Sequence, residues 1–254
     1  MLEKLSISLV AGLVIQAGMI ISGCPASAAE PSAISGYKIN QKSCYLGETE
    51  VQVCAAGLKI LRKANRNEVI TVCPSPFDKI YVYSLKLKKV YVAPTAKYRN
   101  YLCNRLNFIA GNFVSDGTTL TKSGGAMILG RRCDVYKSSA KFALEQRKIH
   151  EQGESTHESI MAYIVTAEPT LINNAQEAAA IYRIYGLAAA TGMPLTARQI
   201  NVEDSETEVL RTSAVTKSIF KPSEFGCPTG FTPVKDEHEL VVDLRNTEDS
   251  IPLF

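Results

Sequence analysis

The three histidines are the side chains best suited to acid–base or metal chemistry, and their spacing supports neither. His150 and His157 are each followed by a glutamate but stand seven residues apart. A zinc-binding helix instead places its two histidines four residues apart, on one face. His238 stands among three acidic residues, which is typical of a surface segment. We therefore predict a solvated charged segment around His150 and His157, and no metal site.

Other short motifs with chemical potential are incomplete. Lys122-Ser123-Gly124-Gly125 contains residues of a phosphate-binding loop but lacks the G-x-x-x-x-G-K-[ST] pattern, so we predict a simple turn there. The sequence has no G-x-S-x-G motif that would expose a nucleophilic serine. These observations predict a chain that is not an enzyme, has no catalytic residues and needs no cofactor.

Seven cysteines are the remaining candidates for chemistry, and six of them follow the first thirty residues. In an exported chain, six cysteines without any C-x-x-C pair predict three disulfides, each worth about 2 to 4 kcal/mol, rather than a metal site. The predicted disulfide cysteines are Cys44, Cys54, Cys73, Cys103, Cys133 and Cys227. The connectivity stays open, but Cys54 and Cys73 are the first expected pair, since a turn near Asn65 would align their strands.

Residues 1–28 have the pattern of a bacterial secretory signal peptide, with Lys4 before an apolar run from Leu5 to Ile21. Two processing routes stay open, because Ile21-Ser22-Gly23-Cys24 resembles a lipobox and Ala26-Ser27-Ala28 fits ordinary signal peptidase. We expect an exported protein of the periplasm or cell envelope, with a possible membrane tether through lipid on Cys24. A net charge of +3 is too small to indicate nucleic-acid binding.

The order of apolar runs predicts one β-rich domain and a monomer. Residues 29–50 are expected to form a tether with an irregular first strand, and residues 51–254 a single domain. Short runs rich in Val, Ile, Leu and Tyr predict antiparallel strands. The expected strands are Val51–Arg62, Glu68–Cys73, Lys79–Lys86, Lys89–Ala93, Ala126–Leu129, Arg132–Tyr136, Ser159–Thr166, Leu195–Val202, Glu208–Lys217 and Leu240–Leu244.

The hairpin from Ile80 to Val92 has two apolar faces. A turn at Leu87-Lys88 would set Tyr83 opposite Val92. This register places Tyr81, Tyr83, Leu85, Val90 and Val92 on one face and Ile80, Val82 and Tyr91 on the other. The hairpin therefore predicts a sheet buried on both sides, or a curved sheet with a ligand cavity on one side.

Helical spacing appears at three places. Asn174 is a predicted N-cap for a helix extending to Ala190, with Ile181, Tyr182 and Tyr185 on its apolar stripe and Arg183 facing solvent. Lys97–Ala110 is a second amphipathic candidate. Lys141–His157 could be a charged helix or an extended hairpin arm, and the sequence leaves both open.

The order of segments resembles a known superfamily. The tyrosine-rich hairpin is followed by Gly130-Arg131-Arg132-Cys133-Asp134-Val135-Tyr136 and then by Gly192-Met193-Pro194-Leu195. Over roughly residues 50–235 this resembles the lipoprotein-carrier-like superfamily, which includes the periplasmic lipoprotein localisation factor. The resemblance implies an α+β fold, in which a curved antiparallel sheet forms an incomplete barrel and helices cover its concave face.

The resemblance and the apolar residues together give two functional hypotheses. In the first, the chain is non-enzymatic and binds lipid acyl chains or an acylated protein in an apolar cavity. The residues expected to line that cavity are Tyr81, Tyr83, Leu85, Val90, Val92, Tyr182 and Tyr185. In the second, the cavity is filled, and the chain is a structural or sensory cell-envelope module that binds a protein partner. The volume of the cavity distinguishes the two hypotheses.

Overall fold

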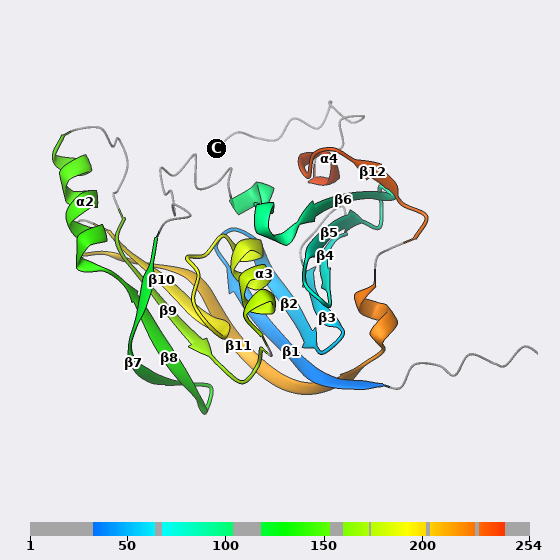
Figure 1. Ribbon diagram of the computed structural model, residues 1–254, viewed down its shortest axis with the longest axis horizontal. Helices are drawn as coiled ribbons and strands as arrows, with labels where there is room; N and C mark the ends of the chain where they lie inside the picture. Colours follow the sequence, from blue (N-terminus) through cyan, green and yellow to red (C-terminus); the bar gives the residue numbers. More distant parts are fainter. Residues whose placement is uncertain are drawn as a thin grey trace, which may run out of the picture. The chain divides into compact units, whose positions relative to one another are not determined.

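One twelve-stranded sheet dominates the computed structural model, which describes residues 33–63, 68–103, 118–152, 160–172, 174–201, 204–226 and 229–241 (Figure 1). Its strand order is β12-β6-β5-β4-β3-β2-β1-β11-β10-β9-β8-β7, and only the β12–β6 pair is parallel. The strands are β1 (Ile34–Ser43), β2 (Gly47–Cys54), β3 (Gly57–Arg62), β4 (Val69–Pro74), β5 (Lys79–Ser84), β6 (Lys89–Pro94), β7 (Leu120–Ile128), β8 (Arg131–Ser138), β9 (Ile160–Glu168), β10 (Met193–Asn201), β11 (Glu206–Phe220) and β12 (Thr232–Val234).

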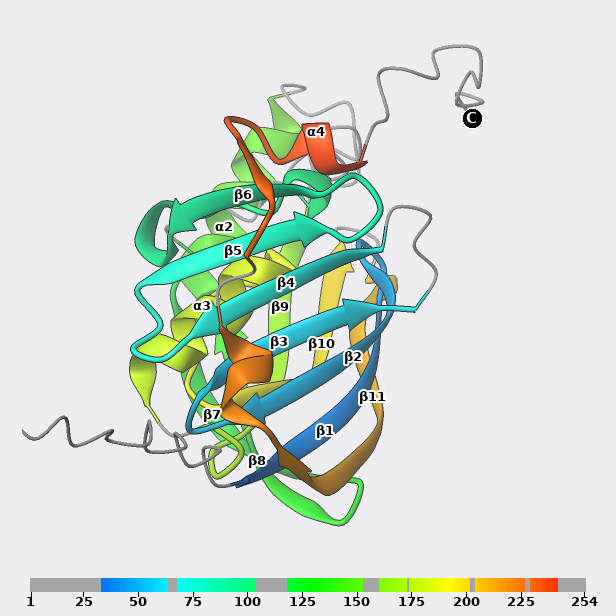
Figure 2. The ribbon, with the colours of Figure 1, turned by 90° about the vertical axis from the view of Figure 1, so that its right-hand side faces the viewer.

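The helices lie on different sides of this sheet. The sheet curves around α3 (Ala175–Tyr185), which lies against its inner, concave face (Figure 1). The 3-10 helix η2 (Pro222–Phe225) lies on the outer face (Figure 2). The remaining helices are η1 (Thr95–Lys97), α2 (Ala140–Glu151) beside β9, and α4 (His238–Val241) beside β5 and β6. The predicted α+β class, a curved sheet with helices on its concave face, is confirmed.

Alternating side chains define the inner face. Ile39 is opposite Val51, and Val51 is opposite Ile60 on the next strand. All three are at most 1% exposed. Because neighbouring side chains along a strand point to opposite faces, the intervening residues, such as Lys38 and Lys59, lie on the outer face. The apolar inner face therefore needs a cover, and α3 supplies it.

The sequence predicts the start of α3 correctly. The Asn174 side chain caps the helix by accepting a hydrogen bond from the Glu177 backbone N–H at 2.8 Å. The helix ends at Tyr185, earlier than the predicted Ala190. Its C-cap residue, Gly186, adopts a left-handed conformation with φ of 63°, which terminates the helix. Arg183 is half-buried rather than directed to solvent. The predicted stripe is buried, with Ile181, Tyr182 and Tyr185 at most 1% exposed.

The first third of the domain differs from the prediction. The first strand expected within residues 29–50, near Gly36 to Asn40, is present as β1, but the segment also contains the start of β2, and both are internal strands of the sheet. The expected strand Val51–Arg62 is a tight hairpin, because β2 ends at Cys54 and β3 begins at Gly57. Gly57 has a φ of 153°, and a Cβ there would lie 2.8 Å from the Cys73 carbonyl oxygen. Apolar residues continue on both sides of this turn, so the sequence pattern does not indicate a break between the two strands.

Later elements agree better with the sequence. Of the two interpretations of Lys141–His157, the helix is correct as far as Glu151. The predicted strand at Leu240–Leu244 is wrong in its described part, because Leu240 belongs to α4. Half of the predicted helix Lys97–Ala110, residues 104–110, lies outside the described residues, as do the signal segment and Cys24, and in the described half residues 101–103 are α-helical. In the described ranges, no helix has the length and apolar character needed to span a membrane.

A charge placed on the inner stripe of α3 tests this packing. We expect Ile181→Asp to lower the free energy of unfolding by about 3 to 5 kcal/mol, because it buries an unpaired carboxylate in the core. Gln176→Asp places the same charge on an exposed position of the same helix and should change stability by less than about 0.5 kcal/mol. Urea unfolding of both variants measures the difference, and equal midpoints would contradict the packing of α3.

Candidate functional site

The tyrosine-rich hairpin has the predicted faces but not the predicted register. Tyr83 is opposite Val90, and Tyr81 is opposite Val92. The predicted Tyr83–Val92 pair is therefore wrong by two residues, because the turn spans residues 85–88 and its Lys88 N–H donates to the Ser84 carbonyl. A slip of two residues leaves each side chain on its original face. Leu85 lies in the turn instead of the strand and is 36% exposed.

The seven predicted ligand-binding residues separate into two groups on opposite faces of the sheet. Tyr83 and Val90 are buried in a small outer cluster with Val72, and the Phe231 ring packs edge-on against Tyr83 at 5.3 Å. Tyr81 packs against the same cluster, and Val92 is 43% exposed. Tyr182 and Tyr185 belong to α3 and are part of the main core on the inner face. The two groups therefore do not line one cavity.

The inner face is occupied by the chain's own side chains. The Tyr185 hydroxyl lies 2.8 Å from the Thr49 hydroxyl, which joins α3 to β2. On the other half of the sheet, the Gln199 amide donates to the Tyr163 hydroxyl at 3.2 Å. Buried tyrosines thus meet polar partners as well as apolar ones, which fixes their positions. At these contacts the space between α3 and the described strands is taken up by the chain's own side chains.

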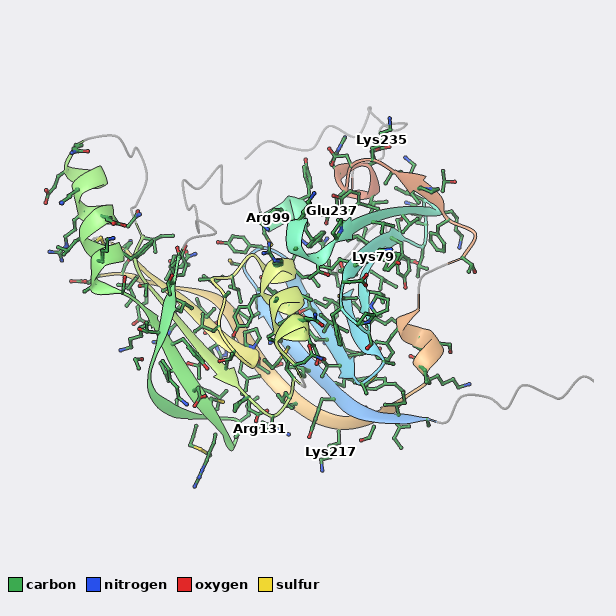
Figure 3. The ribbon with its side chains drawn as sticks, in the orientation of Figure 1. Lys79, Arg99, Arg131, Lys217, Lys235 and Glu237 are labelled. Carbon is green, nitrogen blue, oxygen red and sulfur yellow. The ribbon has the colours of Figure 1, made fainter. Side chains whose placement is uncertain are left out.

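Glu237 is a buried carboxylate just before α4, labelled in Figure 3. It accepts hydrogen bonds from the Tyr98 hydroxyl at 3.2 Å and from the Tyr101 backbone N–H at 3.0 Å. Burial raises the pKa of Glu237 to about 7, although these hydrogen bonds and the charge of Arg62 act in the opposite direction. The carboxyl holds the C-terminal segment against the loop that follows β6, so its ionisation is linked to stability near neutral pH.

The cysteines do not form the predicted disulfides. Cys44, Cys54, Cys73, Cys103 and Cys133 are all free thiols, while Cys227 lies outside the described residues. The Cys54–Cys73 pairing is wrong for a geometric reason. Strand β3 separates the two cysteines. Cys54 lies in a separate small cluster with Phe220 and Phe225, whereas Cys73 lies in the main core.

The edge strand β7 is the most open part of the sheet. Among the described strands β7 pairs only with β8, and residues 121–125 are exposed. The predicted turn at Lys122–Gly125 is wrong, because these residues belong to β7 and surround a register shift between Lys122 and Gly124. A Cβ at Gly124 would meet nothing within 4 Å, and the Met127 side chain is 61% exposed.

The candidates for metal or acid–base chemistry do not come together. No group of three His, Cys, Asp or Glu side chains capable of holding a metal ion occurs in the part of the chain that the structure describes. His238 is half-buried, with its Nδ1 3.1 Å from the Asp236 carboxylate. The side chain of His150 and all of His157 fall outside the described residues.

Similarity to known proteins is weak. No protein-family model and no curated protein matches this sequence. An uncharacterised conserved protein from Thermus thermophilus matches with a TM-score of 0.41 and 8% identity, covering 78% of this chain and 88% of that one. MucB of Pseudomonas aeruginosa, in the structure of its complex with MucA, matches with a TM-score of 0.37 and 10% identity, covering 80% and 58%.

A LolA superfamily protein from Nitrosomonas europaea also matches, with a TM-score of 0.23 and 10% identity, covering 74% of this chain and 86% of that one. At these scores the matches carry no argument about function. Membership of the lipoprotein-carrier-like superfamily therefore stays a prediction, and the function has to be argued from this chain's own geometry.

The buried carboxyl of Glu237 predicts a pH-dependent stability. Since its pKa is raised from 4.5 to about 7, its contribution is fully present below about pH 4.5 and is lost as the pH rises through about 7. The loss should be roughly 3 kcal/mol. Glu237→Gln should remove this dependence, whereas Glu239→Gln, on the more exposed neighbour, should retain it. Denaturant unfolding at about pH 5 and about pH 8 measures the pH dependence of stability in wild type and in both variants. Identical pH profiles for wild type and Glu237→Gln would contradict a role for Glu237.

Free thiols predict a distinctive alkylation pattern. Cys44 is the one exposed cysteine among the described residues, and partial burial of its thiol raises its pKa to about 11. It should therefore react slowly at neutral pH and faster in mild alkali, while the four buried thiols react only after denaturation. Peptide mapping of iodoacetamide-treated protein, with no reductant added, measures this. Unreactive Cys54 and Cys73 in the denatured chain would show that they are oxidised.

Proposed function

We propose that this chain is an exported, non-catalytic binding module that holds a protein partner on the outside of a filled, curved sheet. The single observation that carries the proposal is the occupied inner face. Ile181, Tyr182 and Tyr185 of α3 are at most 1% exposed. Export is inferred from the signal-peptide pattern of residues 1–28.

A filled inner face argues against an internal acyl-chain site. An acyl chain bound between α3 and the sheet would have to displace α3, because ligand cavities measure roughly 300 to 1,000 Å³ and the side chains there are already in contact. Displacement would expose large apolar side chains, at a cost of about 1.5 to 3 kcal/mol for each. The Asn174 cap and the Thr49–Tyr185 hydrogen bond would be lost as well. Binding at an exposed surface carries none of these costs.

Among the described strands β7 is an edge of the sheet, which supports an extended protein segment as the partner. An edge strand presents unpaired backbone N–H and C=O groups, to which a partner strand can add. Gly124 and Gly125 carry no side chains, so a second backbone can approach closely. Lys122, which could repel a partner, is held by Asp134 at 2.8 Å. Met127 would give such a partner an apolar contact.

Lipid binding has one observation in its favour. The outer cluster of Val72, Tyr83 and Val90 is covered by Phe231, so movement of that ring would expose an apolar patch. Leu85 and Val92 are already partly exposed. If this patch binds acyl chains, Val90→Trp should abolish uptake of a fluorescent fatty acid by the folded protein. If it does not, the wild-type protein should show no saturable uptake.

Site-specific photo-crosslinking tests the protein-partner proposal. A photoreactive phenylalanine analogue at Met127 should yield a discrete adduct with one protein in the producing cells, because the partner strand lies against β7. The same analogue at Leu144 on α2 is a matched control, since the two side chains are 61% and 60% exposed. No adduct at Met127, or the same adducts at both positions, would contradict docking at this edge.

A further inference from the structure

Residues 231–240 cover the edge of β6 and carry both β12 and the start of α4 (Figure 2). We call these residues the clasp. Strand β12 pairs with β6 over three residues only, in parallel, and the Thr232 N–H donates to the Lys88 carbonyl at 2.8 Å. Pro233 has no N–H to add to this pairing, and both Thr232 and Pro233 are exposed. The backbone pairing alone is therefore a weak attachment.

Four side chains of the clasp pack inward, at a spacing of three residues. Phe231 packs against the outer cluster, and Val234 and Leu240 pack against the main core. The fourth is Glu237, which is 7% exposed. Three of these attachments are apolar and do not respond to pH. The fourth is a carboxyl whose charge changes with pH, so the attachment of the clasp depends on the ionisation of Glu237.

Glu237 is surrounded by titratable and charged groups. They are Arg62 of β3, Tyr91 of β6, Tyr98, Tyr101 and Cys103 of the segment after β6, and Asp236 and His238 of the clasp itself. Burial raises the pKa of Tyr98 and of Cys103 well above their ordinary values, so both stay neutral around pH 7. Among the described residues, no ion pair joins Arg62 to Glu237. An ionised Glu237 in the closed clasp therefore lacks a paired cation.

The sign of the pH effect follows from this burial. The pKa of Glu237 is about 7 in the closed clasp and about 4.5 when the carboxyl is in water. Release of the clasp should thus become about tenfold more favourable for each pH unit between these values, or roughly 70-fold between pH 5 and pH 8. The ion pair of Lys89 with Glu239 is long, at 3.9 Å, and partly exposed, so it adds little to either state.

We propose that the clasp is a pH-sensitive cover, which detaches from β6 as the pH rises through neutrality while the rest of the sheet stays folded. Detachment frees the backbone groups of β6, at the end of the strand order opposite β7, and uncovers Tyr83 and Val90 of the outer cluster. At lower pH the closed clasp keeps this edge from pairing with another strand. The clasp does not involve β7, so it can be tested separately from the proposed function.

Hydrogen exchange of the full mature chain, followed by mass spectrometry at pH 5 and pH 8, tests local release. Protection factors are compared, because they remove the direct effect of pH on the exchange chemistry. Peptides from the clasp should be at least about tenfold less protected than peptides from β2, and their protection should fall roughly 70-fold from pH 5 to pH 8. Equal protection of the clasp and β2 would overturn the proposal, because the clasp would then open only when the whole domain unfolds.

Variants assign the pH response to Glu237. Glu237→Gln cannot ionise and should give the same clasp protection at pH 5 and pH 8. Glu239→Gln, two residues further along the clasp, is the matched control and should respond to pH as wild type does.

Tyr98→Phe is a second test that keeps the carboxyl. It removes a hydrogen bond that favours the ionised form, so clasp protection should fall by more at pH 8 than at pH 5. A pH response that persists in Glu237→Gln, or an equal loss of protection at both pH values in Tyr98→Phe, would overturn the proposal.

Discussion

The packing of α3 against the inner face of the sheet is the contact on which the rest of the structure depends. The inner face is apolar across several strands, with Ile39, Val51 and Ile60 almost completely buried. A sheet of this kind cannot leave such a face in water, because each exposed large side chain costs about 1.5 to 3 kcal/mol. The stripe of Ile181, Tyr182 and Tyr185 meets this requirement, and the Asn174 cap fixes where the helix begins.

This packing determines where binding can occur. Where α3 covers the inner face, the described surfaces that stay open are the outer face and the edges of the sheet. The edge strand β7 offers backbone groups and little side-chain obstruction at its glycines. This edge is suited to an extended protein segment.

Local features of the sequence predict local features of the structure well. Asn174 marks the start of α3 because an N-cap is a contact over three residues, and the hairpin's two faces follow from alternation alone. The turn before Gly57 was missed because apolar residues continue across it. That omission merged β2 and β3 into one expected strand, and it made Cys54 and Cys73 look adjacent when β3 lies between them.

The candidate sites were less accessible to sequence reasoning. Alternation separates Tyr83 from Val82 but does not say which of the two faces α3, and only the assembled sheet assigns Val82 to the core. The pairing of β1 with β11 joins residues that are about as far apart as the domain allows, with a bulge that no pattern in the sequence marks. Glu237 is isolated from Tyr98 along the chain, so its burial has no local signal.

Native mass spectrometry of the mature protein, purified from its producing cells, tests the central claim most directly. If α3 fills the inner face, the mass should equal that of the processed polypeptide, including any lipid attached covalently to Cys24, with no non-covalently bound fatty acid or phospholipid. A bound acyl lipid that survives transfer to the gas phase, and that is lost when Ile181 is replaced by a larger side chain, would contradict the account. Such a result would mean that the ligand displaces α3 from the inner face of the sheet.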